Sequence, residues 1–299
     1  MLPFKDHNPT HITPYVTYAL IAANVLVFLI MLALPDEMAG RTKFALGAIP
    51  AVIFQIKEIA AHDAILPAGA DFLSVLTSQF LHAGWWHLIG NMLYLWVFGN
   101  NIEDAMGHWR FLVFYLLCGS GAALVNAGIE PQSIIPTIGA SGAVSGVLGA
   151  YLLLYPRARV MVFAFYMLLP LPAFLVLGLW IFMQVANLGG GGESNIAWWA
   201  HIGGFGLGMA LVLLFKYRHV KILGKGDLSQ TARPGSAAAA AAAAAELKVV
   251  EPEPEPEADQ PAPWGPEIKG PWVAKSPPRP EPPPKRRSTI PRAGDRDKD

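Results

Sequence analysis

The sequence is poor in cysteine and in charge. It contains one cysteine, Cys118, so no disulfide bond can form within the chain. Charged residues make up 15% of the chain, compared with about 25% in soluble globular domains. The formal net charge is zero, which predicts no general attraction to nucleic acid. These shortages argue against a soluble domain and against a nucleic-acid-binding protein.

Apolar residues are abundant instead, at 53% of the chain, and they gather in long runs. Runs of about 18 or more apolar residues are typical of transmembrane helices. We predict six such helices, at residues 14–34, 85–102, 109–128, 141–156, 171–188 and 196–215. A mixed loop is expected at residues 35–71 and a short interfacial helix at residues 160–169. The expected fold class is an all-α membrane protein, a bundle of six transmembrane helices.

The two ends of the chain differ from this middle part. Residues 1–13 form a polar N-terminal stub, and residues 14–217 contain the predicted bundle. Residues 218–299 are rich in alanine and proline, and such a segment buries too little apolar surface to fold. We therefore expect a disordered C-terminal tail.

Positively charged residues predict the orientation. Lysine and arginine mark the cytoplasmic side of membrane proteins. Under the six-helix count one side collects Lys5, Arg110, Arg157, Arg159, Lys216, Arg218, Lys221 and Lys225. Both termini are then cytoplasmic, and we expect an integral protein of a bacterial inner membrane.

Two polar residues lie at the same depth in different predicted helices. Ser141 precedes the first charge of its segment, Arg157, by 16 residues, which is roughly 24 Å of helix. His201 precedes Lys216 by 15 residues, roughly 22 Å. The hydrocarbon core is about 30 Å thick, so both side chains lie inside it. Polar groups at such depth are costly, and each is therefore a functional candidate.

A third helix brings a polar pair to this level. His87 and Asn91 precede Glu103 by 16 and 12 residues, roughly 24 and 18 Å. Spaced four residues apart, they share one helix face. His82 lies further toward the membrane surface. It is either a residue at the mouth of the site, holding water or polar backbone, or an ordinary interfacial histidine.

These residue types suit acyl transfer. A serine hydroxyl becomes nucleophilic when a base takes its proton, and a neutral imidazole is the usual base. No aspartate or glutamate lies at the matching depth, so we expect a Ser141–His201 dyad. The N–H groups of His87 and Asn91, with free backbone N–H groups at a helix N-terminus, suit an oxyanion.

Glycines favour a close approach of the two helices that carry the dyad. Gly142, Gly146 and Gly149 line one helix, and Gly204 and Gly208 share a face with His201. Small residues let membrane helices approach closely. Glycine stripes are also common in bundles that do no chemistry, so pure packing is the alternative.

Three segments resemble the motifs of rhomboid intramembrane serine proteases. Residues 81–91 contain the H-x-x-x-N segment, residues 139–142 the G-x-S-G motif, and residues 200–204 the A-H-x-G-G motif. The resemblance implies Ser141 as nucleophile and His201 as general base. It also implies His87 and Asn91 as oxyanion donors, and it implies no metal or organic cofactor. We expect His82, Gly139, Gly142 and Gly204 to support the site. Substrates are expected to be single transmembrane helices within the lipid bilayer.

Two departures from the family pattern leave open how the first loop is anchored and what orients His201. Many members carry a Trp-Arg pair in the first loop, but here the pair is Trp109-Arg110. Some place an aromatic residue four positions after the serine, where this chain has Ser145.

Residues 171–188 carry no dyad residue and are the expected substrate gate. The alternative function is a non-catalytic rhomboid-like protein that binds or chaperones membrane clients. A transporter is disfavoured because the predicted spans lack charged residues apart from Arg110, which lies at the end of its span.

Overall fold

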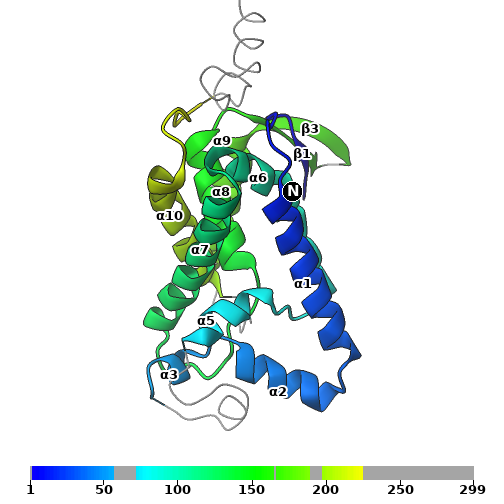
Figure 1. Ribbon diagram of the computed structural model, residues 1–299, viewed down its shortest axis with the longest axis vertical. Coiled ribbons are helices and arrows are strands. Elements are labelled where there is room, and N and C mark those ends of the chain that lie inside the picture. Colours follow the sequence, from blue (N-terminus) through cyan, green and yellow to red (C-terminus); the bar gives the residue numbers. More distant parts are fainter. Residues whose placement is uncertain (1, 57–71, 165, 189–196, 225–299) are drawn as a thin grey trace, which may run out of the picture. The chain divides into compact units, whose positions relative to one another are not determined.

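The computed structural model describes residues 2–56, 72–164, 166–188 and 197–224. Helices dominate this part of the chain (Figure 1), and each of the six longest overlaps one predicted span. They are α1 (Tyr15–Ala33), α6 (Trp85–Met106), α7 (His108–Ile129), α8 (Ser141–Leu154), α9 (Ala173–Asn187) and α10 (Trp198–Phe215). By length and composition α1, α7 and α10 can cross a membrane, whereas α8 and α9 are apolar but shorter.

Helix α8 lies at the centre of these helices. Every residue from Gly142 to Tyr151 is buried, and α6, α7, α9 and α10 pack around it. Its 14 residues span about 21 Å, which is less than the thickness of a hydrocarbon core. The helix begins at Ser141, so this serine starts α8 well inside the layer that the longer helices fill.

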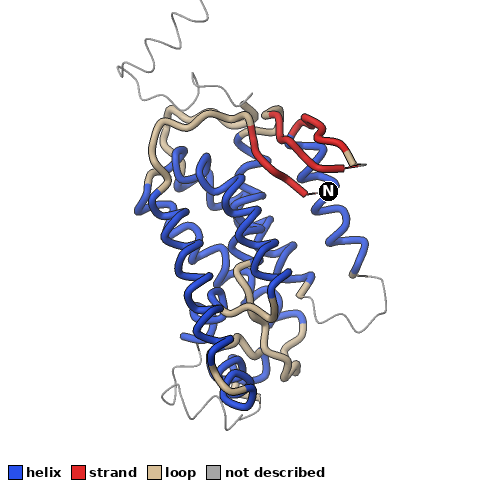
Figure 2. The backbone as a smooth tube through the Cα atoms, turned by 90° about the vertical axis from the view of Figure 1, so that its right-hand side faces the viewer, coloured by secondary structure: helices blue, strands red, loops and turns tan. Residues whose placement is uncertain are grey.

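The chain also contains a small sheet, so the prediction of an all-α fold was wrong. Strands β1 (Leu2–Asp6), β2 (Arg159–Ala164) and β3 (Met167–Pro172) pair antiparallel in the order β1-β2-β3. Figure 2 shows them together at one end of the helices. We expected a short helix at residues 160–169, but the described residues of this segment belong mainly to strands β2 and β3. The N-terminal stub supplies the first strand.

The sequence of β2 explains the strand. Val160 and Val162 are buried and alternate with the exposed or half-buried Arg159, Met161 and Phe163. Alternation with a period of two and β-branched residues favour a strand. Strand β3 contains prolines, which lack an N–H group and are confined to edge strands, and β3 is an edge of this sheet.

Short helices lie between α1 and α6, and the first two of them occupy part of the segment expected as a mixed loop, residues 35–71. They are α2 (Asp36–Leu46), α3 (Pro50–Ile53), α5 (Leu73–Thr77) and the 3₁₀ helix η1 (Ser78–Phe80). Backbone hydrogen bonds join this segment to the loop before α8. Ala48 and Thr137 exchange two such bonds, at 3.1 and 2.9 Å, and Gly139 N–H donates to the Ser78 carbonyl at 2.9 Å. The segment therefore holds the loop that leads to Ser141.

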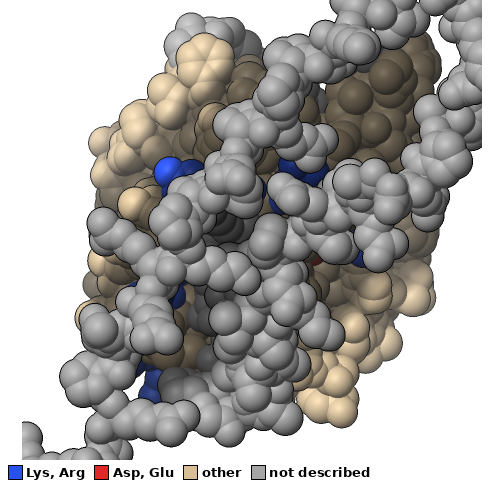
Figure 3. Space-filling model, turned by 90° about the horizontal axis from the view of Figure 1, so that it is seen from above, with Lys and Arg blue, Asp and Glu red and all other residues tan. Residues whose placement is uncertain are grey.

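The end that carries the sheet also carries basic residues, and Figure 3 looks onto it. Arg110, at the start of α7, lies over the ring of Tyr217 at 5.3 Å. Residues beyond α10 bind this end: Tyr217 N–H donates to the Ala105 carbonyl, and Leu223 N–H donates to the Leu153 carbonyl. The helical unit therefore extends beyond residue 217. The disordered tail was predicted for residues 218–299; residues 218–224 belong to the described part of the chain, and residues 225–299 lie outside it.

Candidate active site

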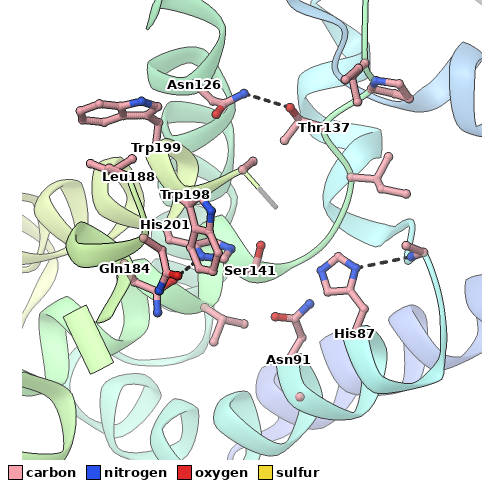
Figure 4. Close-up of a pocket in the computed structure, with 18 of the residues that line it drawn as sticks. His87, Asn91, Asn126, Thr137, Ser141, Gln184, Leu188, Trp198, Trp199 and His201 are labelled. Carbon is pink, nitrogen blue, oxygen red and sulfur yellow. Dashed lines mark hydrogen bonds between the residues drawn. The ribbon is translucent and has the colours of Figure 1, made fainter. Parts of the chain in front are cut away.

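Ser141 occupies the first position of α8 and points toward a cavity (Figure 4). The chain reaches it through Gly139, whose φ of +123° lies in a region that L side chains avoid. The N–H groups of the first helical turn have no partner within the helix, so they are available near the serine. Ser145 donates a 2.6 Å hydrogen bond to the Ser141 carbonyl, so its hydroxyl is used inside α8.

His87 packs directly on Gly139. A Cβ atom at position 139 would lie 2.6 Å from His87 Nε2, so only glycine fits there. Nδ1 of His87 accepts a hydrogen bond from the Ala83 N–H at 3.4 Å. In a neutral ring this places the proton on Nε2, on the side of the ring that meets the loop before Ser141.

Asn91 lies one turn further along α6, on the same wall of the cavity as His87. Its amide nitrogen is 3.1 Å from Nε2 of His82, and because an amide nitrogen only donates, His82 is the acceptor. His82 is 2% exposed and does not line the cavity. It therefore lies behind Asn91, where it fixes the direction of the amide, and not at the mouth as expected.

His201 reaches the cavity from the first turn of α10. Its Nδ1 atom is 2.9 Å from Oε1 of Gln184 on α9. The rings of Trp180 and Trp198 flank it, with centroids 6.1 and 6.0 Å away. From the sequence, Gln184 was included only within the expected gate, residues 171–188. The signal for its contact was a lone glutamine in an apolar helix, since such a group needs a partner.

The two helices that carry Ser141 and His201 touch through their backbones. A Cβ atom at Gly204 would lie 2.2 Å from the Gly142 carbonyl oxygen, and one at Gly208 would lie 2.0 Å from the Gly146 carbonyl oxygen. No side chain fits between α8 and α10 at these positions. The predicted glycine stripe is thus found, and it brings the two helices as close as membrane helices come.

One cavity of about 790 Å³ joins these groups. Its walls include the four predicted site residues Ser141, His201, His87 and Asn91, together with polar side chains that the prediction did not include: Asn126, Glu130, Ser133, Thr137, Gln184 and Asn187. Within the described residues no hydrogen bond joins Ser141 to His201, and no group of three or more His, Cys, Asp or Glu side chains is placed to hold a metal ion. The structure brings the four residues together, and their catalytic roles stay predictions.

A family comparison agrees with the motifs. The sequence model described as the rhomboid domain matches residues 69–218, which is half of the chain and includes all four cavity residues named above. The chain belongs to the rhomboid family. With three helices long and apolar enough to cross a membrane, this rhomboid is an integral membrane protein.

Individual relatives come from several kingdoms and compartments. The chain is similar to rhomboid protein 1, mitochondrial, of Saccharomyces cerevisiae, with 32% identity over 46% of this chain and 40% of the relative. It is similar to rhomboid protease GluP of Bacillus subtilis, with 33% identity over 50% of this chain and 25% of the relative. RHOMBOID-like protein 6, mitochondrial, of Arabidopsis thaliana is 27% identical over 50% of this chain and 54% of the relative. The chain thus matches about half or less of the length of these relatives.

Proposed function

We propose that this rhomboid is a serine endopeptidase that cleaves the transmembrane helices of single-pass membrane proteins. The observation that carries the proposal is the meeting of Ser141, His201, His87 and Asn91 around one cavity. A serine, an imidazole and several N–H donors are the groups that acyl transfer requires.

The reaction follows from the roles of the two dyad residues. Nε2 of His201 takes the proton from Ser141 Oγ as this oxygen attacks the scissile carbonyl carbon. The imidazolium then gives the proton to the leaving amine, and the peptide C–N bond breaks. A water molecule, deprotonated by the same imidazole, hydrolyses the acyl-serine and restores both side chains.

Three sources of N–H groups stabilise the oxyanion that forms on the carbonyl oxygen. His87 contributes Nε2–H and Asn91 contributes the amide hydrogen that His82 does not bind. The first turn of α8 adds backbone N–H groups and the positive end of the helix dipole. These donors are in place before reaction, which is the condition for strong transition-state stabilisation.

Water and substrate reach the site by different routes. Polar residues line part of the cavity, such as Glu130 and Ser133, and they favour an aqueous opening on that side. Helices α6 and α9 line opposite walls, and Tyr94 and Trp180 meet between them with ring centroids 6.5 Å apart. We infer that a transmembrane substrate enters sideways between these two helices, as α9 moves outward.

The membrane arrangement belongs to the same proposal. All six long helices cross the bilayer, with α8 entering it only as far as Ser141, and residues 14–217 hold the catalytic machinery. Strand β1 and residues 217–224 lie on the side that carries the sheet and the basic residues, which we propose to be the cytoplasmic side. A bacterial inner membrane remains our proposed location, and the mitochondrial relatives make a fractionation experiment its direct test.

Labelling with a fluorophosphonate tests the central proposal. The purified full-length protein is treated with the reagent in detergent, beside the Ser141→Ala, His201→Ala and Ser133→Ala variants. Ser133 lines the same cavity and serves as the matched serine control. We expect the wild type and Ser133→Ala to be labelled and to cleave a transmembrane substrate, and the two dyad variants to do neither.

Labelling that persists in Ser141→Ala would contradict the dyad. A folded wild type that binds transmembrane helices but is never labelled would instead favour a non-catalytic, client-binding rhomboid.

A further inference from the structure

His201 is bound by a neutral side chain from another helix. Gln184 is buried on α9, and its Oε1 atom is 2.9 Å from His201 Nδ1. Its amide nitrogen donates to the Trp180 carbonyl at 3.1 Å. This second bond fixes the direction of the amide, because the nitrogen faces the carbonyl and the oxygen faces the imidazole (Figure 4).

The direction of the amide determines the tautomer of His201. An amide oxygen only accepts hydrogen bonds, so Nδ1 of the ring must carry the proton. In a neutral imidazole the other nitrogen, Nε2, then holds the free lone pair. The opposite tautomer would set the Nδ1 lone pair against the amide oxygen and lose the bond. Gln184 thus favours the tautomer in which Nε2 can take a proton from Ser141.

The other neighbours of His201 do not make this choice. Trp180 and Trp198 limit the tilt of the ring through their faces and edges, but such contacts do not distinguish one ring nitrogen from the other. Among the residues that the structure describes, no aspartate or glutamate hydrogen-bonds the ring. In a Ser–His–Asp triad a carboxylate accepts the hydrogen bond from Nδ1 of the histidine. Here the amide oxygen of Gln184 accepts that bond.

We propose that Gln184 is the positioning residue for His201 and that it acts by selecting this tautomer. The inference rests on the proposed protease function and adds to it the group that holds the base. An amide suits the position because an uncharged acceptor avoids the cost of a buried carboxylate. Since Gln184 belongs to α9 and His201 to α10, the tautomer is held only while these two helices are packed together.

Two substitutions at position 184 distinguish the effect of the hydrogen-bond acceptor from the effect of side-chain packing. Gln184→Met keeps a side chain of similar length without an acceptor, and Gln184→Glu keeps both the shape and the acceptor. Loss of one hydrogen bond predicts that Gln184→Met lowers kcat and the fluorophosphonate labelling rate roughly tenfold, with KM unchanged. Gln184→Glu, assayed at pH 8, is expected to retain most of both rates.

Asn187 provides the matched control. It lies on the same helix, lines the same cavity, and donates its amide to the Met183 carbonyl at 2.6 Å, but it has no bond to His201. Asn187→Leu should label at the wild-type rate. The inference is wrong if Gln184→Met also labels at that rate, or if Gln184→Met and Gln184→Glu lose activity equally.

A spectroscopic measurement tests the inference without activity. In the full-length protein labelled with ¹⁵N-histidine, the His201 signals are identified by their loss in His201→Asn. We expect the Nδ1–H tautomer in the wild type and a mixture of tautomers in Gln184→Met. An unchanged tautomer in Gln184→Met, in a wild type that is labelled by fluorophosphonate, would overturn the role of Gln184 and leave the protease intact. The Nδ1–H tautomer in an unlabelled wild type would overturn the protease alone.

Discussion

Glu103 of α6 receives two hydrogen bonds from Thr17 of α1, one from its backbone N–H at 2.7 Å and one from its hydroxyl at 2.6 Å. Its other oxygen accepts the Val16 N–H at 2.9 Å. Helix α1 has no capping side chain or acidic residue of its own in its first turn. Glu103 therefore caps α1 from a neighbouring helix, where a negative charge also meets the positive end of the helix dipole.

Loss of the Thr17 hydroxyl should destabilise this contact. Thr17→Val removes a buried hydrogen bond to a charged group, and we expect the free energy of unfolding to fall by about 1.5–3 kcal/mol. Thr42→Val is the control, because the Thr42 hydroxyl donates to a carbonyl of its own exposed helix. Unfolding in mixed detergent micelles measures both, and equal effects of the two variants would show that the cap contributes little.

Asn91 should act on the transition state. Asn91→Ala removes one oxyanion donor, and such a loss commonly raises the barrier by about 2.7–4 kcal/mol, less if His87 carries part of the load. We expect kcat to fall while KM changes little, as measured by steady-state cleavage of a transmembrane substrate. A rise in KM at constant kcat would assign Asn91 to substrate binding.

The contact between α8 and α10 should tolerate no methyl group at Gly204. Gly204→Ala places a Cβ atom 2.2 Å from the Gly142 carbonyl oxygen, so the two helices must separate, and stability and Ser141 labelling should both fall. Gly206 lies two residues further on, and a Cβ atom there meets nothing within 4 Å. Gly206→Ala should therefore be neutral or stabilising by up to about 1 kcal/mol. Equal behaviour of the two variants would contradict the backbone contact.

Asp6 should make stability depend on pH. Burial is the main cause that raises the pKa of Asp6 from 3.8 to about 7, and the Tyr151 hydroxyl, 2.7 Å away, opposes the shift. Because the folded state favours the neutral carboxyl, this contribution to stability is complete below about pH 4 and is lost as the pH rises through 7. The change is about 1.4 kcal/mol for each unit of pKa difference.

Asp6→Asn removes this titration while it keeps an acceptor for Tyr151. We expect the variant to gain stability relative to the wild type as the pH rises from 5 to 8, as measured by thermal unfolding in detergent. Parallel pH profiles for the two proteins would refute the assignment to Asp6.

A disulfide bond between cysteines introduced at the outer ends of α6 and α9 should distinguish the step of substrate entry from the chemical step. If substrates enter between these helices, the link slows cleavage of a transmembrane substrate. A small soluble fluorophosphonate still labels Ser141, because it reaches the cavity from water. Unchanged cleavage in the linked protein would exclude this route, and cleavage restored by a reducing agent is the control for the link itself.

The positions of Ser141 and His201 along their helices could be predicted from the sequence, but their contacts with residues distant in the sequence could not. Charges such as Arg157 and Lys216 mark helix ends, and a fixed rise per residue then sets the level of Ser141 and His201. The partner of His201 depends on how α9 packs on α10, which no local pattern records. The expected gate residues show the same limit. Within the expected gate, residues 171–188, Phe182 is 64% exposed and the Trp180 ring lies beside the His201 ring, a difference that no local pattern records.

The sheet was missed for a related reason. Leu2 pairs with Phe163, and a short, mainly apolar strand such as β2 is difficult to distinguish from a short helix without its partner. Only the alternation of buried and exposed residues in β2 indicated a strand, and a short helix at residues 160–169 was predicted in its place.

The pairing of β1 with β2 also determines when β1 can join the fold during synthesis. The ribosome makes β1 before β2, and 152 residues lie between Asp6 and Arg159. At about 5–20 residues per second the first strand waits on the order of 8–30 s for its partner. Strand β1 therefore joins the sheet late, although it is made before β2, and the sheet closes only after α8 has been synthesised.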